Sequence, residues 1–163
     1  MDAVFSPADH HAMALAIAAS REALAAGDMP FGATLSSADG QVLWVARNAQ
    51  ISTQDCMAHA ETVLVQQVQR ELGPQALQGA TVHASGEPCA MCSGALFWAG
   101  VRRVVYAAST EDIAHSLGGP VLPVTAAQVL GSAQPQVSVQ GGLQRDAAVQ
   151  VLQAKGLAAD AAS

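Results

Sequence analysis

Apolar and polar residues alternate along the chain with two different periods, one typical of helices and one typical of strands. An alanine-rich segment follows Ser6, a helix-capping residue type, and predicts a helix that ends near Gly27. Two short runs rich in β-branched and apolar residues, 31–36 and 41–47, flank a turn-forming sequence at 38–40. This part of the chain therefore predicts one helix followed by a β-hairpin.

The rest of the chain continues the alternation of helices and strands. After Glu61, apolar residues recur at helical spacing and predict a helix from about His59 to Leu72. The further predicted elements are a strand at 81–85, a Cys-x-x-Cys helix that ends near Gly100, a strand at 103–107, a loop at 117–136 with one short helix, a strand at 136–140 and a helix at 143–155. We expect a single domain over residues 1–157 and a frayed tail at 158–163.

Composition supports a folded, acidic protein. Of the 163 residues, 51% are hydrophobic and only 12% are charged, which is typical of a compact globular chain. Seven Lys and Arg face thirteen Asp and Glu, a formal net charge of −6. Because binding to nucleic acid usually requires clustered positive charge, we expect no nucleic-acid partner.

Cysteine usage and the N-terminal sequence predict a cytoplasmic protein. Three cysteines, two of them in Cys-x-x-Cys, do not form the paired framework of a secreted disulfide protein. No Lys or Arg precedes Arg21, so the basic region of a signal peptide is not expected. The uncharged run 12–20 is too short to span a bilayer, and we expect no membrane association.

Two short motifs carry the candidate chemistry: His59-Ala60-Glu61 and Pro88-Cys89-Ala90-Met91-Cys92. One imidazole and two thiols are the protein ligands of a catalytic zinc site with an open fourth position. Cys89 and Cys92 are three apart and share one face of a helix, and Pro88 is expected in its first turn. Glu61 does not belong to this ligand set, and a carboxylate at the head of an apolar stripe requires a polar partner. The pattern indicates a metal site with a free acid or base beside it.

Other interpretations of the same cysteines remain. Cys-x-x-Cys can also be a redox pair or half of a structural zinc site. Cys56 precedes His59 closely enough to act as a fourth ligand, which would close the site; otherwise we expect it to be a small buried hydrophobe. The other histidines have no motif around them and are expected to be surface or hydrogen-bonded residues: His10, His11, His83 and His115.

At these motifs the chain resembles the cytidine deaminase superfamily, in the branch of bacterial guanine deaminases and tRNA adenosine deaminases. The resemblance covers about residues 13–106. The matching segments are Met29–Ala33, Asn48, Asp55, Ala58–Glu61 and Ser85–Ala95. It implies an α/β protein with a three-layer α/β/α fold, in which a mixed five-stranded sheet carries helices on both faces. It also implies a homodimer.

The resemblance implies roles for individual residues. His59, Cys89 and Cys92 would bind one Zn²⁺ per subunit, and Glu61 would move protons between the attacking water, the ring and the departing ammonia. The residues that would contact the base are Asn48 by hydrogen bonding, Phe31 and Trp98 by stacking, and the backbone around Ala33, Ser85 and Glu87. Core packing is the alternative role for Phe31 and Trp98.

The substrate is less sharply indicated. An aromatic residue at Trp98 resembles guanine deaminases, and only Arg145 and Lys155 are basic after Thr110, which disfavours tRNA. Guanine deaminases carry an acidic segment after the fourth strand, whereas residues 115–120 here contain no acid. The nearest acids are Glu111 and Asp112. We expect a free nucleobase, guanine first and then cytosine or an analogue; the alternatives are tRNA adenosine-to-inosine deamination and a non-catalytic zinc-binding scaffold.

Overall fold

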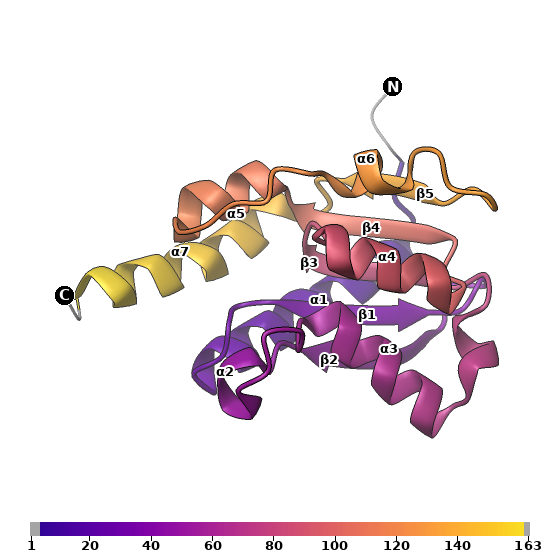
Figure 1. Cartoon of the computed structure of the whole chain (residues 1–163), viewed down its shortest axis with the longest axis horizontal. Helices are drawn as coiled ribbons and strands as arrows, with labels where there is room; N and C mark the ends of the chain where they lie inside the picture. Colours follow the sequence, from indigo (N-terminus) through magenta and orange to yellow (C-terminus); the bar gives the residue numbers. More distant parts are fainter. Residues whose placement is uncertain (1–3, 162–163) are drawn as a thin grey trace.

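A mixed sheet forms the middle layer of the protein, shown as a computed structural model in Figure 1. The structure describes residues 4–161, with side chains to Gly156. The strand order is β2-β1-β3-β4-β5; β1 is antiparallel to both neighbours, and the β3–β4 and β4–β5 pairs are parallel. The strands are β1 (Gly32–Ser36), β2 (Val42–Arg47), β3 (Thr81–Gly86), β4 (Arg103–Ala108) and β5 (Ser138–Gly141). The predicted mixed sheet of five strands is confirmed.

Helices cover both faces of this sheet, as predicted. One face packs against α1, α5 and α7, and the other against α3, α4 and α6, so each face has its own buried apolar cluster. The helices are α1 (Pro7–Ala25), α2 (Gln50–Thr53), α3 (Ala60–Glu71), the 3₁₀ helix η1 (Pro74–Leu77), α4 (Ala90–Ala99), α5 (Thr110–Leu117), α6 (Ala126–Leu130) and α7 (Arg145–Ala161). None of the helices in the described range combines the length and apolar character that a bilayer crossing requires.

The first helix lies tightly against the sheet. It begins at a capping box in which Ser6 and Asp9 exchange side-chain and backbone hydrogen bonds, as the helix start in the sequence predicted. Gly32 at the start of β1 faces this helix, and an added Cβ would lie 2.1 Å from the Ala16 carbonyl oxygen. The absence of a side chain at Gly32 therefore allows α1 to pack closely against β1.

A buried polar cluster ties α1 to the middle strands. The His83 Nε2 atom lies 2.8 Å from Asp9 Oδ1, and the Arg103 guanidinium donates to both oxygens of the same carboxylate. Burial raises the pKa of Asp9, but the bonds from Arg103 and His83 outweigh it and hold the pKa below its usual range. His83, which is 2% exposed, is thus a hydrogen-bonded structural histidine, as expected.

The parallel pairing of β3 and β4 sets the position of the functional site. Gly86 at the end of β3 is in register with Ala108 at the end of β4. Because the strands are parallel, the segments that follow them leave the sheet at the same edge. The segment after β3 leads into α4 with its two cysteines, and the segment after β4 leads into α5.

The structure differs from the sequence prediction in the connections and at the C-terminus. The helices α2 and α5 were not predicted; α2 is a single turn, and α5 begins at a capping box formed by Ser109 and Asp112. The last helix continues past Lys155, so residues 158–161 of the predicted frayed tail are helical, and 162–163 lie outside the described residues. Pro88 precedes the N-cap of α4 and is not in its first turn as predicted.

Candidate active site

Three side chains from two helix starts form a candidate metal site. The Nδ1 atom of His59 lies 3.6 Å from Cys89 Sγ and 3.5 Å from Cys92 Sγ, and all three ligand atoms lie within 4.8 Å of one another. Tetrahedral zinc with ordinary Zn–N and Zn–S bonds would separate a nitrogen from a sulfur by about 3.6 Å. The donor atoms therefore fit a zinc ion with one coordination position left for water.

The local backbone explains why these side chains converge. His59 is the N-cap residue of α3 and Cys89 that of α4, both with extended backbone angles. Neither side chain forms a capping hydrogen bond to its own helix, so both are free to turn toward a shared metal position. The partial positive charge at a helix N-terminus also favours the thiolate that binds metal. Cys92 lies in the first turn of α4 and is fully buried.

Hydrogen bonds among the three ligand side chains shift the pKa values of the two thiols in opposite directions. A hydrogen bond from Cys92 and another with His59 lower the pKa of Cys89 to about 4. The bond to Cys89, together with burial, raises the pKa of Cys92. The neighbouring Cys89 raises the pKa of His59. A bound zinc ion would deprotonate both thiols, because a coordinating thiol is held as thiolate.

The fourth-ligand alternative is wrong for this chain. Cys56 is exposed and lies outside the group of three ligand atoms. The expectation that Cys56 is a small buried hydrophobe is wrong for the same reason. The site therefore has three protein ligands, the number that catalytic zinc sites use.

Glu61 lies beside the metal ligands and is nearly buried. It belongs to the first turn of α3, is 6% exposed, and its Oε2 atom is 3.5 Å from Cys92 Sγ. Burial raises the pKa of this carboxyl group, with a smaller raising effect from Cys89. A carboxyl group with a raised pKa can both accept and return a proton near neutral pH.

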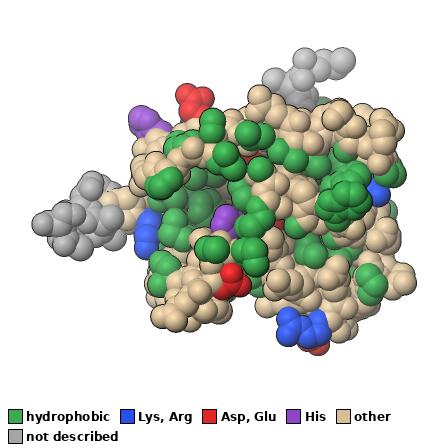
Figure 2. Space-filling view, in the orientation of Figure 1, with side chains coloured by type: hydrophobic (Ala, Val, Ile, Leu, Met, Phe, Trp, Pro, Cys, Tyr) green, Lys and Arg blue, Asp and Glu red, His purple; other side chains and the backbone are tan. Residues whose placement is uncertain are grey.

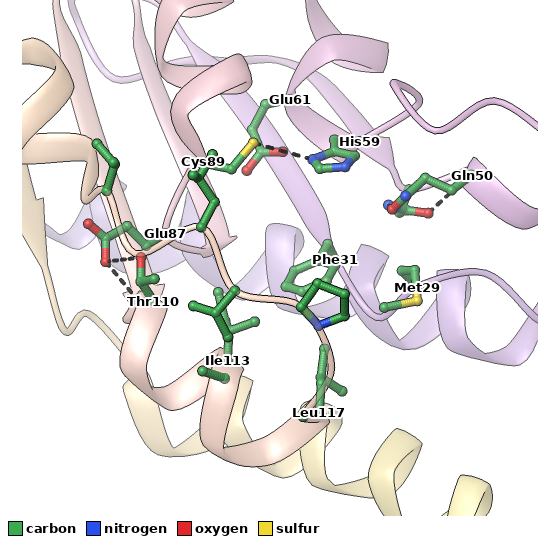
Figure 3. A pocket seen from close by; sticks show the side chains of 17 residues that line it. Met29, Phe31, Gln50, His59, Glu61, Glu87, Cys89, Thr110, Ile113 and Leu117 are labelled. Atoms are coloured by element: carbon green, nitrogen blue, oxygen red, sulfur yellow. Dashed lines mark hydrogen bonds between the residues drawn. The ribbon is translucent and has the colours of Figure 1, made fainter.

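A cavity of about 420 Å³ opens onto these groups. Figure 2 shows it as a hollow surrounded largely by hydrophobic side chains, and Figure 3 shows the residues that line it. His59, Glu61 and Cys89 lie at one end of the cavity and Leu117 at the other, with Phe31 between them. This volume is in the range of small-molecule binding sites, about 300–1,000 Å³.

The structure brings three of the six predicted base contacts to the cavity, namely Phe31, Asn48 and Glu87. The Phe31 ring packs against Gly86, where an added Cβ would lie 2.8 Å from a ring carbon. Asn48 is 1% exposed and exchanges hydrogen bonds with Gln50, whose backbone N–H donates to Asn48 Oδ1. The Asn48 side chain is thus held in one orientation at the cavity wall.

The other three predicted contacts lie elsewhere in this chain. Ala33 is fully buried in the apolar core beside the sheet. The Ser85 hydroxyl accepts a hydrogen bond from the Gly32 backbone N–H at 3.0 Å. Trp98 is 84% exposed on the outer face of α4, edge-on to Phe97, so it neither stacks in the cavity of its own chain nor packs in the core.

Part of the cavity wall, and a buried residue that supports it, were not predicted from the sequence. Asp28 accepts hydrogen bonds from the Ile51 and Ser52 backbone N–H groups and fixes the turn that carries Gln50. The opposite wall comes from α5 and the segment 118–124. The capping box at Ser109 was the available signal for α5, but no local signal pairs Asp28 with its distant partners.

The Glu87 carboxylate connects the start of α5 and the start of α6 to the segment before α4, the helix that carries the two cysteines (the metal helix). One oxygen accepts from the Thr110 backbone N–H at 2.8 Å and its hydroxyl at 2.9 Å; the other accepts from the Ala126 backbone N–H at 2.9 Å. Glu87 lies two residues before Cys89 and is 7% exposed. These three bonds fix the orientation of the side chain and use most of its capacity to accept hydrogen bonds.

These features define a class of protein. A zinc-ligand set of one His and two Cys with a separate Glu is the arrangement of zinc-dependent deaminases. Residues 6–108 match the family model for the cytidine and deoxycytidylate deaminase zinc-binding region, and the chain belongs to this family of hydrolytic deaminases.

Known members similar to this chain act on different substrates. A probable cytosine deaminase of Schizosaccharomyces pombe is 33% identical over 82% of this chain and 83% of its own length. A tRNA-specific adenosine deaminase of Bacillus subtilis is 36% identical over 57% of each chain. The solved guanine deaminase of Nitrosomonas europaea has a TM-score of 0.80 and 25% identity, covering 94% of this chain and 86% of that one. The fold and the metal site are thus those of the family, whose members are named for several different substrates.

Removing a proposed ligand tests the metal site. We expect the wild-type protein to carry about one zinc ion per chain. Cys92→Ser should lose most of it, because a serine hydroxyl is a far weaker ligand than a thiolate. Cys56→Ser, at an exposed cysteine outside the group, should keep the wild-type zinc content. Elemental analysis of dialysed protein measures both, and equal zinc loss in the two variants would contradict the assignment.

Substituting Glu87 tests its role as the connection. In Glu87→Gln, an amide NH₂ must face a donor, which leaves a buried group unpaired at a cost of about 1–3 kcal/mol. We expect faster hydrogen exchange in α5 and α6 with unchanged zinc content. The control is Glu111→Gln, at an exposed position on α5. Exchange that rises equally throughout the chain, or does not change, would contradict this role.

Proposed function

We propose that this protein is a zinc-dependent hydrolytic deaminase of a small amino-heterocycle, most simply a free nucleobase: guanine first, and cytosine or an analogue next. The observation that carries the proposal is the buried Glu61 carboxyl group, which lies beside the three metal ligands and lines the cavity. A structural zinc site has no use for such a group, and its burial has a cost that function must justify.

Glu61 would handle every proton in the reaction. His59, Cys89 and Cys92 would hold the zinc ion, which when bound would supply a water molecule whose pKa is lowered from about 15.7 toward about 7. Glu61 accepts the proton of the attacking water and passes it to the ring nitrogen next to the amino carbon. It would then take the remaining proton of the hydroxyl group added to the amino carbon and deliver it to the amino group; the carbon–nitrogen bond breaks, a ring carbonyl forms and ammonia leaves. The raised pKa of Glu61 suits both steps, because the group must take and release a proton near the same pH.

The charge and shape of the cavity favour a small substrate over tRNA. In the described part of the chain, no Lys or Arg side chain lines the cavity. The formal net charge of −6 also opposes a polyanion. Segment 118–124 and α5 form one wall of the cavity within the chain itself. These observations support a free heterocycle that enters the cavity whole.

The acidic residues give guanine less support. Asp112 caps α5 and pairs with Arg145, and neither Glu111 nor Asp112 lines the cavity. The acid that guanine deaminases use for the purine therefore has no counterpart in α5, and Glu87, which does line the cavity, already accepts hydrogen bonds from Thr110 and Ala126. Guanine remains first among the unmodified bases because of the family resemblance.

We also propose that the protein is a homodimer formed through α4. Trp98 is 84% exposed and Met91 is 37% exposed on this helix, and both residues project from the face opposite the buried one. An apolar surface of this kind is typical of a subunit interface. The interface would explain why so large an aromatic side chain lies outside both the core and the cavity.

Replacing Glu61 tests the chemistry. Glu61→Gln should reduce ammonia release by about 10²-fold or more while zinc content is unchanged, because the amide cannot shuttle protons. The matched control is Glu71→Gln, at an exposed position of the same helix. The assay screens guanine, cytosine, adenine, their nucleosides and unmodified tRNA. Inosine formed in tRNA without turnover of any free base would favour the tRNA alternative, and full activity of Glu61→Gln would contradict the mechanism.

Substituting Trp98 tests the interface. Trp98→Lys should convert the dimer to a monomer, because burying an unpaired ammonium group on both sides of a twofold contact is unfavourable. Val4→Lys, at a 93% exposed position, should remain dimeric. Sedimentation equilibrium measures the mass of each variant. A monomeric wild-type protein, or a dimeric Trp98→Lys variant, would contradict the proposed interface.

A further inference from the structure

The cavity has two chemically different halves. The half at the metal site carries polar side chains from His59, Glu61, Asn48 and Gln50. The half formed by α5 and the following segment is apolar, and Figure 3 shows Ile113 and Leu117 on this side, away from His59. The larger apolar side chains of this half are Ile113, Leu117, Pro120, Val121, Leu122 and Val124.

The polar side chains near the apolar half are already engaged. Both oxygens of Glu87 accept hydrogen bonds, and the Thr110 hydroxyl donates to one of them. These bonds come from the chain's own fold and leave Glu87 and Thr110 little capacity for a ligand. In the described part of the chain, the α5 side of the cavity therefore offers apolar contacts in place of hydrogen-bonding side chains.

This wall is also unusually apolar for an exposed surface. Val121 is 51% exposed, Leu122 is 64% exposed and Val124 is 37% exposed, and all three line the cavity. Large apolar side chains at the mouth of a pocket gain free energy when a ligand covers them. A ligand that presents a polar edge here would lose hydrogen bonds to water without replacement.

We propose that the preferred substrate is an amino-heterocycle with an apolar group, such as an alkyl chain, on the edge opposite its amino carbon. The amino carbon and its ring nitrogen face Glu61, and the apolar group lies against Leu117, Val121 and Leu122. Guanine has polar atoms on its far edge and fits this wall less well. This inference rests on the proposed function and narrows its substrate class.

A matched set of pyrimidines tests the wall. The N1 position of cytosine lies across the ring from the amino carbon, so the set is cytosine, 1-methylcytosine, 1-propylcytosine and 1-(2-hydroxyethyl)cytosine, with guanine as reference. We expect kcat/KM to rise by about fourfold for each buried methylene group. The propyl compound should exceed the hydroxyethyl compound by about tenfold, because the hydroxyl loses water without gaining a partner. Calorimetric Kd values with the Glu61→Gln protein should show the same order without turnover.

Variants locate the effect. Val121→Asn combined with Leu122→Asn changes only exposed wall positions, and it should remove most of the difference between the propyl and hydroxyethyl compounds. Leu72→Asn, at a 47% exposed position away from the cavity, should keep the full difference.

The outcomes separate the two proposals. Ammonia released with equal preference for the two compounds, or with guanine preferred over every alkylated compound, would overturn the apolar-wall inference and leave the deaminase proposal intact. Equal loss of preference in Leu72→Asn and the wall variant would also overturn it. No ammonia from any compound with zinc-loaded protein would overturn the proposed function itself.

Discussion

The Glu87 carboxylate is the interaction on which the arrangement of the site depends. It leaves the chain between β3 and α4, and it accepts hydrogen bonds from the start of α5 and the start of α6. A buried carboxylate is unfavourable without partners, so its burial requires these two helix starts to lie close to it. The metal helix and the opposite wall are thereby held at a fixed separation. The cavity is the space that this separation leaves.

The polar side chains of the metal site lie at the same edge of the sheet, where they lower the stability of the fold. The buried Cys92 and Glu61 side chains and the half-buried Cys89 and His59 side chains are placed where apolar residues would stabilise the fold more. Zinc offsets part of that cost, because binding to a preformed ligand set stabilises the folded state. Placing His59 and Cys89 at N-cap positions adds no backbone strain, since residues there ordinarily have non-helical backbone angles. The site therefore needs no unusual backbone conformation at these ligands.

Local patterns in the sequence predicted much of the fold and the metal half of the site. The helix after Ser6, the hairpin and the two motifs depend on residues close together in the chain. Trp98 lies off the buried face of α4, which Cys92, Leu96 and Ala99 mark. Helical spacing alone could have excluded it from the cavity of its own chain. Cys56 had no such periodic context, because it follows a single helical turn.

The other half of the cavity could not be derived from local patterns, because it depends on contacts between distant parts of the chain. Glu87 and Ala126 are 39 residues apart, and Asp28 meets Ile51 across 23. Loop closure over such distances is specified by the tertiary fold and not by the residues of the loop. The metal half follows a short motif shared across a family with several substrates, whereas the apolar half belongs to the segment after β4. If the apolar half selects the substrate as we propose, chemistry and selectivity have separate structural origins, and the second can change while the first stays constant.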